Sequence, residues 1–92
     1  MSTDYKAEVK LYTTPWCPYC VRAKGLLKRK NVPFEDFNVA SDPQLRRQIV
    51  ERTGKTSVPQ IFINDQPIGG CDELHTLEAI GQLDQMLAVA PS

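Results

Sequence analysis

Two cysteines separated by two residues, Cys17 and Cys20, are the residues of this chain whose types and spacing best support chemistry. They follow a short apolar strand pattern and open a helical one, which is typical of a redox Cys-x-x-Cys motif. Pro18 suits the first helical position, so Cys17 is predicted to be the N-cap. A sulfur there faces the positive end of the helix dipole, which favours the thiolate. We therefore expect Cys17 to attack and Cys20 to resolve.

Zinc binding is the main alternative for this pair, because Cys-x-x-Cys also occurs as half of a zinc site. Four ligands are needed, and only Cys71 and His75 remain, at a spacing that could place both on one helical face. The strand-to-helix context favours the redox interpretation, and we expect no metal site. A structural disulfide is also disfavoured, because a bridge across two residues closes almost no loop.

Length and charge limit the classes of function. The chain has 92 residues, which predicts a single domain over residues 1–92. Eleven basic residues balance eleven acidic ones, and this argues against a nucleic-acid or anionic-membrane partner. No apolar stretch approaches a membrane span, and the polar start at residues 1–6 lacks the apolar run of a signal peptide. We therefore expect a cytoplasmic protein with reduced thiols.

The elements that must position the cysteines follow from periodicity and caps. A strand, a helix, a strand and a second helix are followed by a tight pair of strands and a last helix. The second helix begins with a cap, a helical proline and a capping-box glutamine, and Asp72 is predicted to cap the third helix. The predicted ranges are strands at 9–13, 33–39, 60–63 and 67–69, and helices at 18–30, 43–53 and from residue 72, with a break at Gly81.

This order, β-α-β-α-β-β-α, predicts an α/β protein with a four-stranded mixed sheet flanked by helices. The arrangement is thioredoxin-like. Cys17 and Cys20 would then lie at the carboxyl end of the first strand, where open α/β sheets place their sites.

Three motifs carry a resemblance to a known family. They are Cys17–Cys20 (Cys-Pro-Tyr-Cys), Ser57–Ile63 (Ser-Val-Pro-Gln-Ile-Phe-Ile) and Gly69–Leu74 (Gly-Gly-Cys-Asp-Glu-Leu). In this order and spacing the chain resembles the dithiol glutaredoxins of the small bacterial type. The resemblance implies glutathione-dependent reduction of glutathionylated or disulfide-bonded proteins. Glutathione would be a co-substrate, recycled by an NADPH-dependent reductase, with no tightly bound cofactor. We expect the protein to act as a monomer.

The resemblance also implies a glutathione site. The proline matching Pro59 is cis in the family, and the backbone at Val58 pairs with the cysteine of glutathione like an added strand. The γ-glutamyl carboxylate is held near the helix start at Cys71 and Asp72, where free N–H groups face an anion. Asp72 could instead be an ordinary N-cap, or it could serve both as a cap and as part of the glutathione site. The expected binding residues are Tyr19, Val58, Pro59, Gly70, Cys71, Asp72 and Arg46, with Cys71 a non-catalytic thiol beside the ligand.

Arg46 enters through a departure from the family pattern. These proteins commonly carry Lys or Arg three residues before the first cysteine, where the cation assists the thiolate and the glycyl carboxylate of glutathione. Here that position is Thr14. Arg46 is our first candidate for the missing cation, and Arg47 and Lys55 are the alternatives.

Two other functions compete with glutathione-dependent reduction. One is a hydrogen donor of the same fold that is recharged by thioredoxin reductase. The other is an iron–sulfur carrier that holds a cluster between two subunits through Cys17 and glutathione. Known cluster carriers usually have a monothiol Cys-Gly-Phe-Ser motif, so Pro18 and the resolving thiol of Cys20 count against that function.

Overall fold

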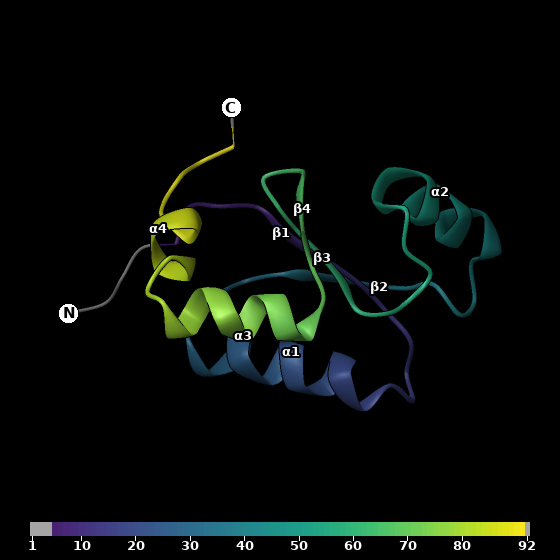
Figure 1. Ribbon diagram of the computed structural model, residues 1–92, viewed down its shortest axis with the longest axis horizontal. Helices are drawn as coiled ribbons and strands as arrows, with labels where there is room; N and C mark the ends of the chain where they lie inside the picture. The colour runs from purple at the N-terminus through teal and green to yellow at the C-terminus, as the bar shows by residue number, and fades with distance from the viewer. Residues whose placement is uncertain (1–4, 92) are drawn as a thin grey trace.

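A computed structural model describes residues 5–91 as four strands and four helices in one arrangement around a sheet (Figure 1). Residues 1–4, within the polar start of the chain, lie outside the described residues. The elements are β1 (Val9–Thr13), α1 (Pro18–Arg29), β2 (Glu35–Asn38), α2 (Pro43–Thr53), β3 (Gln60–Ile63), β4 (Gln66–Gly69), α3 (Cys71–Ala79) and α4 (Leu83–Leu87). No helix within this part of the chain is long and apolar enough to cross a membrane.

The sheet confirms the predicted mixed topology. Its strand order is β2-β1-β3-β4, with β1 parallel to β2 and antiparallel to β3, and with β3 antiparallel to β4. A parallel pair requires a crossover, and α1 supplies it between β1 and β2. The carboxyl end of β1 therefore meets the amino end of α1, at Cys17.

Alternate residues of the strands supply two apolar clusters, one on each face of the sheet. Leu11 and Ile61 pack with residues of α1, α3 and α4 on one face. Tyr12 and Phe62 pack with Ile49 of α2 on the other. Figure 1 shows α1 and α3 side by side, with α2 set apart from them. The two helices that open at the predicted site thus share one layer.

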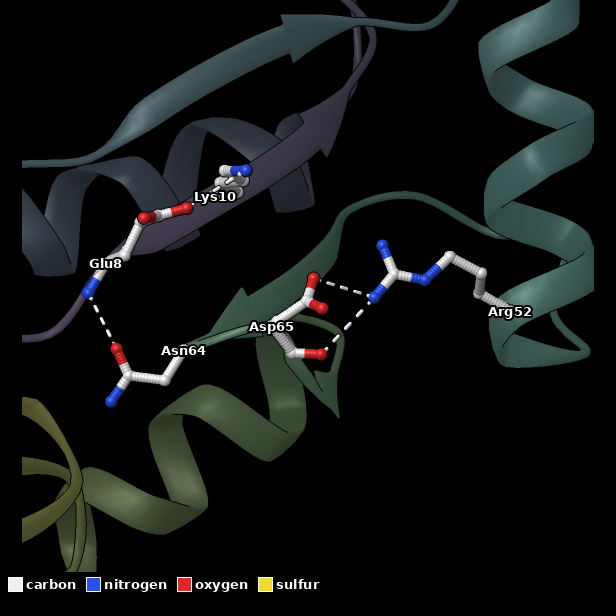
Figure 2. A network of polar contacts seen from close by, with 5 residues as sticks. All are labelled: Glu8, Lys10, Arg52, Asn64 and Asp65. Atoms are coloured by element: carbon white, nitrogen blue, oxygen red, sulfur yellow. Dashed lines mark hydrogen bonds and ion pairs between the residues drawn. The ribbon is translucent and has the colours of Figure 1, made fainter. Parts of the chain in front are cut away.

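Polar contacts hold the β3–β4 turn (Figure 2). Asn64 and Asp65 both have positive φ, 51° and 66°, as a tight two-residue hairpin turn requires. The backbone N–H of Glu8 donates to Asn64 Oδ1 at 2.9 Å, and Arg52 of α2 pairs with Asp65 at 2.8 Å. The hairpin is therefore anchored to the residue before β1 and to α2, near the point where β4 leads into α3.

Lys30 forms ion pairs with α3 and α4 at the end of the helical layer opposite Cys17. Its ammonium, just beyond α1, lies 2.8 Å from Glu78 of α3 and 2.7 Å from Asp84 of α4. This pairing lowers the pKa of Asp84 below its usual value. These ion pairs therefore join α1, α3 and α4 at that end of the layer.

Several bounds and caps of the predicted elements are wrong. The first helix ends at Arg29 and the fourth strand begins at Gln66, each one residue earlier than predicted. The second strand is shorter than 33–39 and spans Glu35–Asn38. The second helix is capped by Asp42, whose carboxylate accepts a hydrogen bond from Leu45 N–H at 3.0 Å. A capping box needs Glu or Gln three residues after the cap, and Gln44 is only two residues after Asp42. The third helix begins one residue before Asp72, at Cys71, with Gly70 as its N-cap. The last apolar turn, at 83–87, forms a separate helix, α4.

Candidate functional site

Cys17 is the N-cap of α1, as predicted. Its backbone is extended, with φ −92° and ψ 116°, and Pro18 follows at the first helical position. The sulfur accepts a hydrogen bond from Cys20 N–H at 3.3 Å and lies 3.7 Å from the carbonyl oxygen of Val58. The side chain is half-buried. The sulfur therefore occupies the positive end of the helix while remaining open to a substrate.

Cys20 is fully buried, one turn into the same helix. Burial raises the pKa of the Cys20 thiol to about 11, because the thiolate would lose its hydration. Cys20 therefore stays protonated at neutral pH. The Cys17 sulfur is the more accessible of the two, as an attacking thiol must be, and the Cys20 sulfur is shielded, as suits a resolving thiol.

A loop with a cis peptide bond faces Cys17. The Val58–Pro59 bond is cis, which confirms the expectation drawn from the family. Gln60, buried at the start of β3, donates from its side-chain amide to the carbonyl of Ser57 at 2.8 Å. That bond fixes the loop from beneath, so the Val58 carbonyl is held against the sulfur.

A groove of about 170 Å³ runs beside this loop. It brings together six of the residues expected to bind glutathione and adds four others. Sequence reasoning missed Ser57, Gln60 and Glu73 as lining residues, because their proximity depends on how three loops converge. The lining residues are Tyr19, Lys55, Ser57, Val58, Pro59, Gln60, Gly70, Cys71, Asp72 and Glu73.

The amino end of α3 forms one wall of the groove. Gly69 has φ 109°, a conformation that favours glycine, and a Cβ there would lie 2.6 Å from Glu73 Oε1. Glu73 accepts from Gly70 N–H at 3.1 Å, which ties the first turn back to the cap. Gly70 leaves room for the cis-proline loop, since a Cβ on it would lie 3.2 Å from the Pro59 carbonyl oxygen. Asp72 is exposed at the second helical position, beside free helix N–H groups.

Cys71 is buried at the start of α3, and burial raises the pKa of its thiol. Its sulfur lies 3.4 Å from His75 Nδ1, and the same ring nitrogen lies 2.9 Å from the Cys71 carbonyl oxygen. All three cysteines are free thiols. Among residues 5–91, no three His, Cys, Asp or Glu side chains gather closely enough to hold a metal ion.

The candidate cations lie in different places. Thr14, at the position where the family carries a cation, is buried. Arg46 does not line the groove beside Cys17, and its guanidinium donates to the Thr56 carbonyl at 3.0 Å. Lys55 does line the groove. Of the two, Lys55 is therefore the better placed to meet an anion bound there.

Comparisons with known proteins agree with this geometry. The sequence profile of the glutaredoxin family matches residues 9–68. The chain is 48% identical to glutaredoxin 3 of Escherichia coli over 81 residues, 88% of this chain and 98% of that protein. The solution structure of a glutaredoxin from Brucella melitensis superposes with a TM-score of 0.82 at 45% identity, covering 92% of both chains. A buckwheat glutaredoxin–glutathione complex superposes with a TM-score of 0.83 at 25% identity, over 88% of this chain and 76% of that one.

Proposed function

Because this chain belongs to the glutaredoxin family and is a glutathione-dependent thiol oxidoreductase, we propose that it reduces protein disulfides and glutathione mixed disulfides through Cys17 and Cys20. The observation that carries the proposal is the asymmetry of the two sulfurs. Cys17 is accessible at a helix N-terminus and touches the cis-proline loop, whereas Cys20 is buried and protonated behind it.

The proposed reaction on a protein disulfide has two exchanges. The Cys17 thiolate attacks one substrate sulfur, forms a mixed disulfide and releases the other substrate sulfur, which takes up a proton. Cys20 then loses its proton and attacks Cys17, so the bond to the substrate breaks and a Cys17–Cys20 disulfide forms. The substrate gains two electrons. Two glutathione molecules restore the dithiol and leave as glutathione disulfide.

A glutathionylated substrate needs only Cys17. The thiolate attacks the glutathione sulfur and releases the substrate thiol, and a second glutathione then attacks the Cys17–glutathione bond. We propose that glutathione lies in the groove, with its cysteine against the Val58 backbone and its γ-glutamyl carboxylate at the amino end of α3. Asp72 would meet the γ-glutamyl ammonium group. Tyr19, Pro59, Gly70 and Cys71 would form the walls.

We further propose that the protein works as a monomer in the cytoplasm, where glutathione keeps thiols reduced. Its partners there would be glutathionylated and disulfide-bonded proteins. The formal net charge of zero supports small-molecule and protein partners over polyanions.

A coupled assay tests the proposed function. We expect the protein, with glutathione, glutathione reductase and NADPH, to turn over a glutathionylated peptide, and to do so without thioredoxin reductase. The readout is NADPH oxidation that depends on both the protein and glutathione. Turnover supported by thioredoxin reductase but not by glutathione would contradict the proposal and favour the alternative hydrogen donor.

Lys55 is expected to bind the glycyl carboxylate of glutathione. Lys55→Met should raise KM for the glutathionylated peptide about two- to fivefold, which corresponds to the loss of one solvent-exposed charge pair. The KM of the variant should also depend less on salt than that of the wild type, because an attractive charge contact is gone. Steady-state kinetics at low and high salt measure both effects.

Arg46→Met and Arg47→Met serve as comparisons. Loss of the Arg46 contact to Thr56 could loosen the loop that precedes Val58, but the salt dependence of KM should then remain as in the wild type. Arg47 is exposed on the same helix, and its replacement should change neither quantity. A flattened salt dependence in Arg46→Met, with none in Lys55→Met, would return the role of the missing cation to Arg46.

A further inference from the structure

Because Cys20 is buried, the two cysteines alone do not stabilise the Cys20 thiolate that the resolving step requires. The resolving step needs a thiolate, yet Cys20 has no exposed surface, and burial raises the pKa of its thiol to about 11. An ionising thiol in such a place needs a nearby positive charge. Lys24, one helical turn further along α1, is the side chain whose position meets that need.

The geometry of α1 directs Lys24 toward Cys20. Residues four apart lie on the same helical face, and side chains lean toward the helix N-terminus, so Lys24 covers the turn that carries Cys20. Its side chain retains only 23% of its exposure. The ammonium lies 2.8 Å from Asp36 Oδ2 on β2, and the other carboxylate oxygen of Asp36 accepts from the Thr13 hydroxyl at the end of β1.

This chain of contacts crosses from the helix to the sheet at the level of the site. Thr13 is buried at the carboxyl end of β1, directly before Thr14. The Thr14 backbone partly offsets the effect of burial on the pKa of Cys20, and the Lys24 charge acts to a smaller extent in the same direction. The ion pair with Asp36 therefore holds the Lys24 ammonium between α1 and the sheet, on the helix that carries the resolving thiol.

We propose that Lys24, oriented by Asp36, supplies the positive charge that stabilises Cys20 as a thiolate whenever the Cys17–Cys20 disulfide forms or opens. The inference rests on the proposed roles of Cys17 and Cys20. In the resolving step Cys20 loses its proton and attacks Cys17, and the substrate sulfur leaves and takes up a proton. When glutathione attacks Cys17 of the disulfide, Cys20 leaves as a thiolate and then takes up a proton. Lys24 is not itself oxidised, reduced or deprotonated in either direction.

Such a charge changes rates without changing the redox equilibrium. At neutral pH reduced Cys20 is a thiol, so the free energy of the reduced protein does not include the thiolate that Lys24 stabilises. The other groups around Cys20 limit the effect. They are Cys17 on the same helix and the Asp36 carboxylate beside Lys24.

Lys24→Met tests the inference. Removing the charge should raise the pKa of the Cys20 thiol, and the unpaired Asp36 carboxylate acts in the same direction. The smaller thiolate fraction, partly offset by its higher nucleophilicity, should slow the resolving step roughly threefold at neutral pH. The measurement is the decay of the Cys17–substrate mixed disulfide in a single turnover on a protein disulfide, followed by acid quench and mass spectrometry across the neutral to alkaline range.

Four comparisons accompany that measurement. Lys24→Arg keeps the charge and should restore the rate. Lys28→Met removes an exposed cation one turn further along α1 and should leave the rate unchanged. The redox equilibrium of Lys24→Met with glutathione should match that of the wild type. In a Cys20→Ser background, Lys24→Met should leave the reduction of a glutathionylated peptide unchanged, since no resolving thiol takes part.

The outcomes distinguish a failure of the role proposed for Lys24 from a failure of the proposed function. A wild-type decay rate in Lys24→Met, or an equal loss in the Cys20→Ser background, would overturn the role of Lys24. A shifted redox equilibrium would also overturn it, because the charge would then act on a ground state. If the wild type forms no Cys17 mixed disulfide at all, the proposed function itself fails.

Discussion

Cys17→Ser is expected to abolish reduction of both a glutathionylated peptide and a protein disulfide, by roughly 10³-fold or more, because the attacking sulfur is gone. Cys20→Ser should affect the reduction of the two substrates differently. It should still reduce the glutathionylated peptide, where glutathione itself can resolve the Cys17 intermediate. It should fail on a protein disulfide that requires an internal resolving thiol, and should accumulate as a mixed disulfide with that substrate.

Assays of both variants on both substrates check this result. Thermal unfolding of each variant is the control, because Cys20 is fully buried and its hydroxyl replacement could loosen the core. A folded Cys20→Ser protein that is inert towards the glutathionylated peptide would contradict the one-cysteine route. Equal activity of Cys20→Ser on the protein disulfide would show that Cys20 is not the resolving thiol.

Gly70→Ala is expected to weaken glutathione binding through the cis-proline loop. The new Cβ would lie 3.2 Å from the Pro59 carbonyl oxygen, so the loop must move by a few tenths of an ångström. The same loop holds the Val58 carbonyl 3.7 Å from the Cys17 sulfur. Since small misplacements at a reacting centre are costly, we expect KM for the glutathionylated peptide to rise on the order of five- to tenfold.

Gly25→Ala is the matched control for that substitution. A Cβ at Gly25, in the interior of α1, meets only the Arg29 guanidinium at 3.6 Å, and alanine favours a helix. This variant should keep the wild-type KM and unfold at a slightly higher temperature. Steady-state kinetics and thermal unfolding of both variants distinguish the two results. An unchanged KM in Gly70→Ala would mean that bound glutathione does not depend on the position of the Val58–Pro59 loop.

Local rules in the sequence determined the chemistry and where it starts. The place of Cys17 at a helix N-terminus follows from Pro18 and from the change of periodicity after β1, both of which act within a few residues. The same holds for the hairpin turn at Asn64 and for the helix end at Gly54, which is left-handed with φ 71°. The mixed sheet then followed from the alternation of elements, because short connections allow few topologies; the strand order β2-β1-β3-β4 came from the structure.

Caps were less certain where neighbouring residues competed for them. Gly70 caps α3 although Asp72 is the better capping residue, because β4 ends at Gly69 with positive φ and Gly70 packs against Pro59. The tertiary contact between two loops overrides the local preference here. That override also places Asp72 in the first turn, facing the groove and its helix N–H groups.

The rest of the site depends on distances between segments far apart in the chain. Sequence alone could not rank Arg46 against Lys55, since the choice depends on how α2 and the loop after it rotate relative to the groove. Nor could it show that Gln60 anchors Ser57, or that Lys24 of α1 meets Asp36 of β2. Residue type and spacing determined which sulfur atoms we propose to react. Packing of the helices on the sheet decided which sulfur is buried and which charges surround it, because burial and charge proximity are properties of the assembled layers.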